Sequence, residues 1–166
     1  MSKTQTVISK DAANKKLVVT RSFDAPRSLV WKAWTESSLL DQWWAPKPWK
    51  AETKSLELHT GGMWLYCMLG PDGTKSWSRV DFETVTPESS FTATVIFCDE
   101  NGIVDESFPS MHWDVTFEST GESTSMTVTI TFSAEADMKQ LIEMGFEQGF
   151  TMGLGNLDEL LAKEAI

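Results

Sequence analysis

Two segments in the last third of the chain alternate strictly between apolar and polar residues. The apolar members are Met111, Trp113, Val115 and Phe117 in the first segment and Met126, Val128, Ile130 and Phe132 in the second. A period of two places the apolar residues on one face of a strand and the polar residues on the other. We therefore expect two antiparallel strands whose apolar faces meet a C-terminal helix, while Thr127, Thr129 and Thr131 face water.

Five earlier segments are rich in β-branched and aromatic residues, which is typical of strands. They span residues 17–23, 51–59, 63–69, 77–86 and 90–98. Gly61 and Gly62 separate the second of these segments from the third, and the sequence Pro-Asp-Gly at 71–73 is typical of a hairpin turn. These short connections predict antiparallel hairpins.

Two other stretches have helical periodicity. Residues 26–45 predict two short helices, because Pro26 suits the first helical position and Pro46 and Pro48 prevent continuation. Residues from about 135 to 163 predict a long helical region. Its apolar stripe consists of Phe146, Phe150, Leu154, Leu157 and Leu161.

The order of these elements predicts an α+β fold. One strand precedes the two short helices, about six strands follow, and the long helical region ends the chain. Only that last helix is long enough to cover the apolar face of the sheet, so we expect a curved antiparallel sheet of about six or seven strands wrapped around it. At 166 residues the chain fits one domain, assigned to residues 15–166. Residues 1–14 are expected to be a loose leader that can include a short strand at 4–9.

Four segments resemble one known family. They are FDAPRSLVWKAW at residues 23–34, LLDQWWAP at 39–46, GGMW at 61–64 and GPDG at 70–73. They resemble the family named for the C-terminal domain of the heat-shock protein 90 ATPase activator, and the resemblance extends over about residues 16–163. This family belongs to the START-related, birch-allergen-like superfamily (SRPBCC). The resemblance implies the helix-grip fold, in which apolar ligands are held between the sheet and the C-terminal helix.

The charge and the cysteines restrict the partners and the compartment. A net charge of −10 with no cluster of Lys or Arg disfavours binding to nucleic acid or to a membrane surface. Residues 1–16 have no apolar signal-peptide core, and no apolar run reaches membrane-spanning length. Cys67 and Cys98 are isolated and form no CxxC motif. We expect a cytoplasmic protein with two free thiols.

Few residues could carry catalysis. The chain has two histidines, lacks the common nucleophile, phosphate-binding and zinc-protease motifs, and shows no metal-ligand spacing. Glu57 and His59 stand two residues apart on one face of a predicted strand. They form either a structural polar pair on the outer face of the sheet or an acid–base couple at the mouth of a cavity. His112 shares its face with Asp114 and should be solvated. We assign no catalytic residue, no metal and no cofactor.

Glycines suggest a cavity beside the C-terminal helix. Gly145, Gly149 and Gly153 recur every four residues, and each costs about 1 kcal/mol relative to alanine inside a helix. Three explanations remain open: close approach of the sheet, open space for a ligand, or a break between two helices at Gly145. The predicted ligand-binding residues are Trp64, Tyr66, Met68, Trp77, Trp113, Phe146, Gly149, Phe150 and Gly153. Tyr66 could orient a ligand through its hydroxyl.

Three functions follow from these features. The first is a noncatalytic module that binds a small hydrophobic or aromatic molecule between sheet and helix. The second is an enzyme similar to the polyketide cyclases and aromatases of the superfamily, using Glu57, His59 or Tyr66. The third, implied by the family name, is a stress-related chaperone cofactor. The resemblance covers only the C-terminal domain of the eukaryotic activators, so we expect this third function least.

Overall fold

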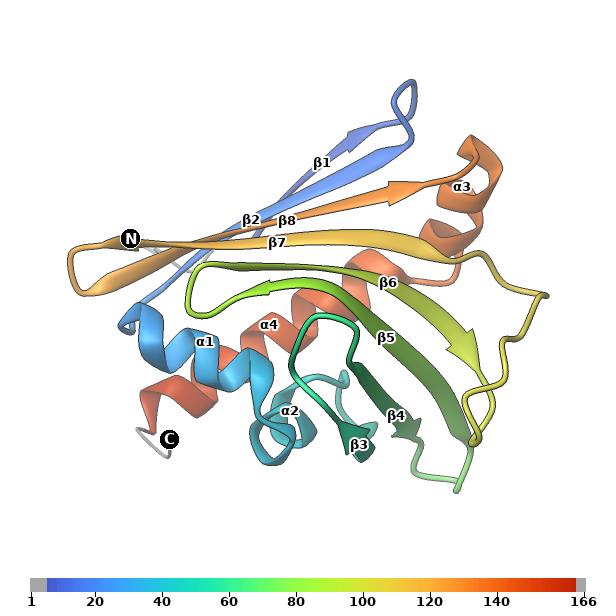
Figure 1. The fold of residues 1–166 in the computed structure, drawn as a ribbon, viewed down its shortest axis with the longest axis horizontal. Coiled ribbons are helices and arrows are strands. Elements are labelled where there is room, and N and C mark those ends of the chain that lie inside the picture. The colour runs from blue at the N-terminus through green and yellow to red at the C-terminus, as the bar shows by residue number, and fades with distance from the viewer. Residues whose placement is uncertain (1–5, 164–166) are drawn as a thin grey trace.

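The computed structural model describes residues 6–163, which form eight strands and four helices (Figure 1). The strands are β1 (Val7–Asp11), β2 (Lys16–Phe23), β3 (Lys50–Leu56), β4 (Met63–Leu69), β5 (Lys75–Thr86), β6 (Ser90–Cys98), β7 (Met111–Thr120) and β8 (Ser123–Phe132). They form one antiparallel sheet in the order β1-β2-β8-β7-β6-β5-β4-β3. The sheet curves around helix α4 (Phe146–Ala162), as Figure 1 shows. The predicted α+β helix-grip fold is confirmed, with eight strands where six or seven were expected.

The alternation in β7 and β8 places the apolar residues in the core and the threonines toward solvent, as expected. Met126, Val128 and Ile130 are fully buried, whereas Thr131 is exposed and Thr127 and Thr129 are partly exposed. Directly paired residues of the two strands share a face, and the apolar residues of both strands enter the core that also contains Leu154 and Leu157 of α4. The strict period of two therefore determined which face of this sheet is buried.

The N-terminal segment contributes the additional strand. Residues 1–5, part of the predicted leader, lie outside the described residues. β1 pairs antiparallel with β2 from Val7 opposite Thr20 to Asp11 opposite Lys16. The strand that the sequence allows at 4–9 thus begins at Val7, and in the described part of the leader the chain extends the edge of the sheet.

The helix pair after β2 forms as predicted. It consists of α1 (Arg27–Thr35) and α2 (Ser37–Trp43), and Glu36 between them is extended, with φ −103° and ψ 126°. Pro26 is the N-cap residue of α1, one position before the helical position expected for it. α2 packs against β3, at the opposite edge of the sheet from β1.

The C-terminal region is two helices. α3 (Glu135–Glu143) ends before Gly145, whose φ of 88° lies in the left-handed region that favours glycine, and α4 begins at Phe146. Of the three explanations left open for the glycine stripe, a break between two helices at Gly145 is therefore the one that applies at this glycine. None of the helices within residues 6–163 combines the length and apolar composition that crossing a bilayer requires.

Candidate functional site

A cavity of about 220 Å³ lies between the concave face of the sheet and the C-terminal helices. Its walls come from strands β4 to β7, from the segment after α2, and from the junction of α3 and α4. The lining residues are Trp44, Pro46, Tyr66, Met68, Ser76, Ser78, Val95, Phe97, Met111, Trp113, Leu141, Met144, Gly145, Phe146, Gly149 and Phe150. Of these, Ser76 and Met144 are exposed and mark where the cavity meets solvent.

The sheet wall of the cavity follows from the pleat of β4 and β5. Tyr66 and Met68 lie on the same face of β4 because they are two residues apart. This is the concave face, since both residues line the cavity. Ser78 is the direct cross-strand partner of Tyr66, so its hydroxyl lies on the same face. This wall therefore combines an aromatic ring with two buried hydroxyl groups, those of Tyr66 and Ser78.

The helix wall is aromatic. Phe146 and Phe150, one turn apart on α4, stack with ring centroids 5.5 Å apart. Trp113 of β7 meets Phe150 edge to face at 5.4 Å and Phe146 at 6.2 Å. These contacts fix the positions of the rings, since each aromatic ring packs against at least one other in a favourable geometry. The resulting wall is apolar, and the ring of Trp113 stands at a steep angle to the two phenylalanine rings.

Tyr66 carries the main polar group of the cavity. Its hydroxyl oxygen accepts a hydrogen bond from Trp44 Nε1 at 2.9 Å. Burial raises the pKa of Tyr66 to about 12, and hydrogen bonding from Trp44 and Ser78 offsets this effect only in part. Tyr66 consequently stays protonated at physiological pH and remains able to donate a hydrogen bond.

The glycines of α4 have two different roles. A Cβ on Gly153 would lie 3.0 Å from the carbonyl oxygen of Trp44, so Gly153 permits close approach of the backbone after α2. A Cβ on Gly149 would meet only Pro46 Cγ, at an ordinary 3.7 Å, beside the cavity. Asn156 strengthens the first contact by donating to the carbonyl oxygen of Ala45 at 3.1 Å. Close approach of two backbones thus explains Gly153. The backbone that approaches α4 is the end of α2 and the residue after it, not the sheet.

Six of the nine predicted ligand-binding residues line the cavity. They are Tyr66, Met68, Trp113, Phe146, Gly149 and Phe150. Trp64 lies next to it: its ring stacks on Tyr66 at 4.1 Å and borders a separate void of about 20 Å³. Gly153 lies outside the cavity, because it faces the backbone carbonyl group of Trp44 rather than the open space.

Trp77 also lies outside the cavity, on the convex face of the sheet. It pairs with Cys67 on one side and Cys98 on the other, and both neighbours alternate with cavity-facing residues. Lys54 lies over its ring, 5.9 Å from the centroid. Both cysteines are free, and burial raises the pKa of each thiol. Because Trp77 lies between them in the sheet, the backbones of the two cysteines are two strand spacings apart, about 10 Å, which is beyond disulfide reach.

Several lining residues were not predicted from the sequence. Trp44 and Pro46 follow α2 directly, and no local pattern shows that this segment turns toward α4. Ser76 and Ser78 could have been found, since the alternation of β5 places them on the face opposite Trp77. Phe97 closes the sheet wall and packs against Phe108, with ring centroids 5.1 Å apart.

Glu57 and His59 do not reach the cavity. Both are exposed in the connection between β3 and β4, and His59 Nδ1 lies 3.0 Å from the carbonyl oxygen of Thr60. His112 is also exposed, and its Nε2 lies 2.8 Å from Glu83 on the convex face. Among the described residues, no three His, Cys, Asp or Glu side chains converge as metal ligands would.

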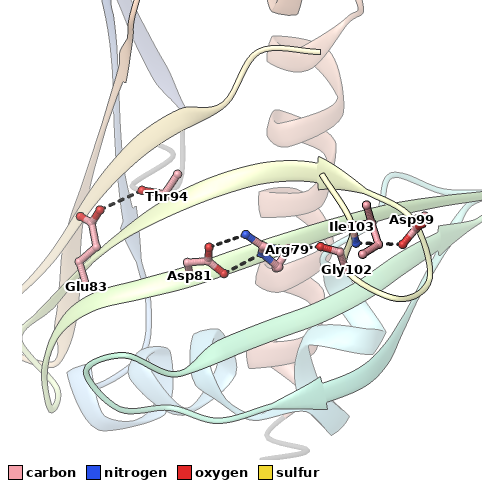
Figure 2. Close-up of polar contacts among 7 residues, drawn as sticks. All are labelled: Arg79, Asp81, Glu83, Thr94, Asp99, Gly102 and Ile103. Carbon is pink, nitrogen blue, oxygen red and sulfur yellow. Dashed lines mark hydrogen bonds and ion pairs between the residues drawn. The ribbon is translucent and has the colours of Figure 1, made fainter. Parts of the chain in front are cut away.

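A second polar cluster lies on the convex face of β5 (Figure 2). Arg79 forms two hydrogen bonds to the carboxylate of Asp81, at 2.9 and 3.0 Å, and a third to the carbonyl oxygen of Gly102 at 2.6 Å. Asp99 accepts a hydrogen bond from the backbone N–H of Ile103. Three of the five N–H donors of Arg79 are thus used within the protein, and the cluster holds the loop between β6 and β7 against the sheet.

Comparisons with known proteins agree with this architecture. The model of the Activator of Hsp90 ATPase homolog 1-like protein family matches residues 24–162. The solution structure of a protein from Arthrobacter aurescens is 31% identical, covers 96% of this chain and 92% of its own, and superposes with a TM-score of 0.90. A crystal structure from Mycobacterium smegmatis is 25% identical, with 95% and 97% covered and a TM-score of 0.87.

A third similar structure, from Staphylococcus epidermidis, is 29% identical, with 96% of both chains covered and a TM-score of 0.83. No curated protein matches the sequence. The family model covers most of the chain, and the fold agrees over nearly its whole length. The chain belongs to the Activator of Hsp90 ATPase homolog 1-like family.

Proposed function

We propose that this protein binds a small hydrophobic or aromatic molecule in the cavity between the sheet and α4, without transforming it. The observation that carries the proposal is the cavity itself, whose walls are mostly aromatic and aliphatic side chains. Sites for small molecules are typically concave and apolar, with a few polar groups that orient the ligand. Tyr66 and Ser78 are such groups.

The volume of the cavity supports a role in binding. Empty space in a protein core costs about 24 cal/mol per Å³, so an enclosed cavity of 220 Å³ would cost about 5 kcal/mol. Opening to solvent near Ser76 and Met144 lowers this cost but does not remove it. The free energy of unfolding of a typical domain is only about 5–15 kcal/mol, so an empty space of this size would remove a large share of it. A ligand that fills the space would restore that stability.

The chemistry of the lining favours binding over catalysis. Of the described residues that line the cavity, Tyr66 alone has an acid–base side chain, and its raised pKa makes it a poor general base near neutral pH. Glu57 and His59, the other candidates for a cyclase-like enzyme, lie outside the cavity. A cyclase of this architecture would therefore lack a base at the site.

Native mass spectrometry of freshly purified protein tests the proposal. We expect a co-purified mass that is lost on denaturation, or, after delipidation, saturable binding of an apolar naphthalene probe followed by quenching of Trp fluorescence. Trp44 and Trp113 line the cavity and would report on occupancy directly. If no mass co-purifies and no apolar probe saturates, the binding function is wrong.

The family match favours a second candidate, stimulation of an Hsp90-type ATPase. A steady-state ATPase assay with and without this protein tests it. A dose-dependent rise in turnover would make chaperone activation the leading function, whereas an unchanged rate would leave ligand binding as the better explanation of the cavity.

A further inference from the structure

We infer that the ligand is an uncharged molecule of about two fused aromatic rings that accepts a hydrogen bond from the Tyr66 hydroxyl. This inference rests on the binding function proposed above and specifies the chemistry of the ligand. Three properties of the cavity lead to it: its volume, the absence of charge from its lining, and the hydrogen bonding of Tyr66.

The volume sets the size of the ligand. An engineered protein cavity of about 150 Å³ holds one benzene ring. The cavity here is about 220 Å³, roughly one and a half times that size. A bicyclic aromatic molecule therefore fits, and the rings of Phe146, Phe150 and Trp113 offer both faces and edges against which its rings can pack.

The lining sets the charge. None of the described residues that line the cavity is Asp, Glu, Lys, Arg or His. A charged group inside would lose its hydration without gaining an ionic partner, which is among the largest penalties in protein interiors. The net charge of −10 adds a repulsion against anions in particular. The buried part of the ligand is therefore uncharged.

Tyr66 sets the polar group of the ligand. Its oxygen already accepts the N–H of Trp44, and the hydroxyl of Ser78 lies opposite it on β5. The Ser78 hydroxyl hydrogen-bonds to Tyr66 as well, and when it donates to the same oxygen the Tyr66 hydroxyl hydrogen is left to point into the cavity from a side chain that is only 4% exposed. Because the raised pKa keeps this hydrogen in place, the free capacity of Tyr66 is that of a donor. A carbonyl or ether oxygen on the ligand satisfies it.

A matched pair of probes isolates this hydrogen bond. Methyl naphthyl ketone has an acceptor, and ethylnaphthalene has nearly the same shape without one. We would measure the ratio of the two dissociation constants by calorimetry in the wild type and in Tyr66→Phe. Comparing ratios cancels both the difference in hydrophobicity between the probes and any general loosening of the cavity in the variant. We expect the preference for the ketone to be about 3- to 10-fold larger in the wild type, as one net hydrogen bond provides.

Two controls accompany this measurement. Thr129→Val removes a hydroxyl from the same sheet, on the convex face, and should leave the ratio of the wild type unchanged. Naphthoate, the anionic relative of the ketone, should bind at least about 10-fold more weakly than the ketone. Tighter binding of naphthoate would overturn the inference of an uncharged ligand.

An infrared spectrum keeps the inference testable if Tyr66→Phe does not fold. The carbonyl stretch of the ketone bound to the wild type should lie below its position in a hydrocarbon solvent, as a donated hydrogen bond requires, and an unshifted band would overturn the inference. If the ratio is the same in both proteins, the ligand class inferred here is wrong while binding stands. If neither probe binds the wild type, the proposed function fails and this inference fails with it.

Discussion

The guanidinium of Arg21 on β2 pairs with the carboxylate of Asp158 on α4. The side chain of Arg21 is 6% exposed and that of Asp158 is 27% exposed, so this ion pair joins the sheet to the C-terminal helix inside the protein. Arg21 also contacts the hydroxyl of Thr6 and lies over the ring of Phe23. A second ion pair, between Lys10 on β1 and Glu147 on α4 at 3.2 Å, joins the same parts of the protein but is more exposed on the lysine side, so the buried Arg21 pair should contribute more to fixing where α4 lies.

Removal of one partner should destabilise the protein strongly. Asp158→Ala leaves the Arg21 guanidinium buried without its carboxylate, and such changes cost about 3–5 kcal/mol. Because Asp158 is partly exposed, we expect the lower end, about 3 kcal/mol, from urea unfolding. The matched control is Glu159→Ala, which removes the neighbouring partner of Lys47 in a pair exposed at 60% and 67% and should change stability by less than about 1 kcal/mol. Equal effects of the two substitutions would contradict a structural role for the buried pair.

Gly153 and Gly155 should respond in opposite directions to alanine. At Gly155 a Cβ meets nothing within 4 Å, so alanine should raise the free energy of unfolding by up to about 1 kcal/mol through helix propensity. At Gly153 the Cβ would meet the carbonyl oxygen of Trp44 at 3.0 Å, and a backbone atom held between α2 and α4 cannot move away cheaply. We expect Gly153→Ala to lower the free energy of unfolding by about 1 kcal/mol, since overpacking exceeds the helix gain. A stabilised Gly153→Ala variant would show that the carbonyl group of Trp44 can move away from the new Cβ at little cost in free energy.

The sequence predicted the parts of this fold that obey a simple period. In β8 each apolar residue from Met126 to Phe132 is buried because a single rule, alternation against a helix, acts along the whole strand. The break at Gly145 was visible only as one alternative, since a glycine inside a helical pattern does not reveal its φ. Pairing of β1 with β2 was harder, because its residues are mostly polar and partly exposed.

The site was harder to predict for a physical reason. Aromatic residues were assigned to the cavity by type, but at Trp77 the usual rule is reversed: the tryptophan packs on the convex face, and Ser76 and Ser78 face the cavity. Open space replaces core packing at this point, so small polar residues are tolerated inside. Trp44 reaches the cavity through tertiary contacts between α2, its following segment and α4, which no local pattern encodes.

Gly149→Leu should fill the cavity between the sheet and α4 and keep the fold. The Cβ has an ordinary contact with Pro46, so the added side chain can extend into the space between helix and sheet. Leucine is the better helix former, so stability should stay the same or rise by up to about 1 kcal/mol. Binding of the naphthalene probes should fall at least about 10-fold, as measured by Trp fluorescence.

Gly155→Leu is the matched control for this substitution. It introduces the same side chain into the same helix, away from the cavity lining, and should bind the probes as the wild type does. A Gly149→Leu variant that still binds would show that the probes occupy another place. A variant with a melting temperature well below that of the wild type would show that the space beside Gly149 is already packed.

Tyr66 should make the free energy of unfolding decrease at high pH. Its folded-state pKa is about 12 against an ordinary value of 10, with burial as the main cause. Below pH 10 both the folded and the unfolded chain hold the proton, and the full stability is present. Between pH 10 and about 12 the unfolded chain releases the proton while the folded chain keeps it, so the free energy of unfolding falls as the pH rises. A shift of this size corresponds to about 3 kcal/mol.

The chain has one tyrosine, so the absorbance of tyrosinate reports on Tyr66 alone. In the folded protein its titration midpoint should lie near pH 12, and in the urea-unfolded protein near 10. Tyr66→Phe should be less stable at neutral pH, because Trp44 Nε1 loses its acceptor, but its free energy of unfolding should fall less steeply above pH 10 than that of the wild type. Parallel stability curves for the two proteins, with an ordinary midpoint in the folded state, would show that the Tyr66 hydroxyl is open to water and that the cavity does not bury it.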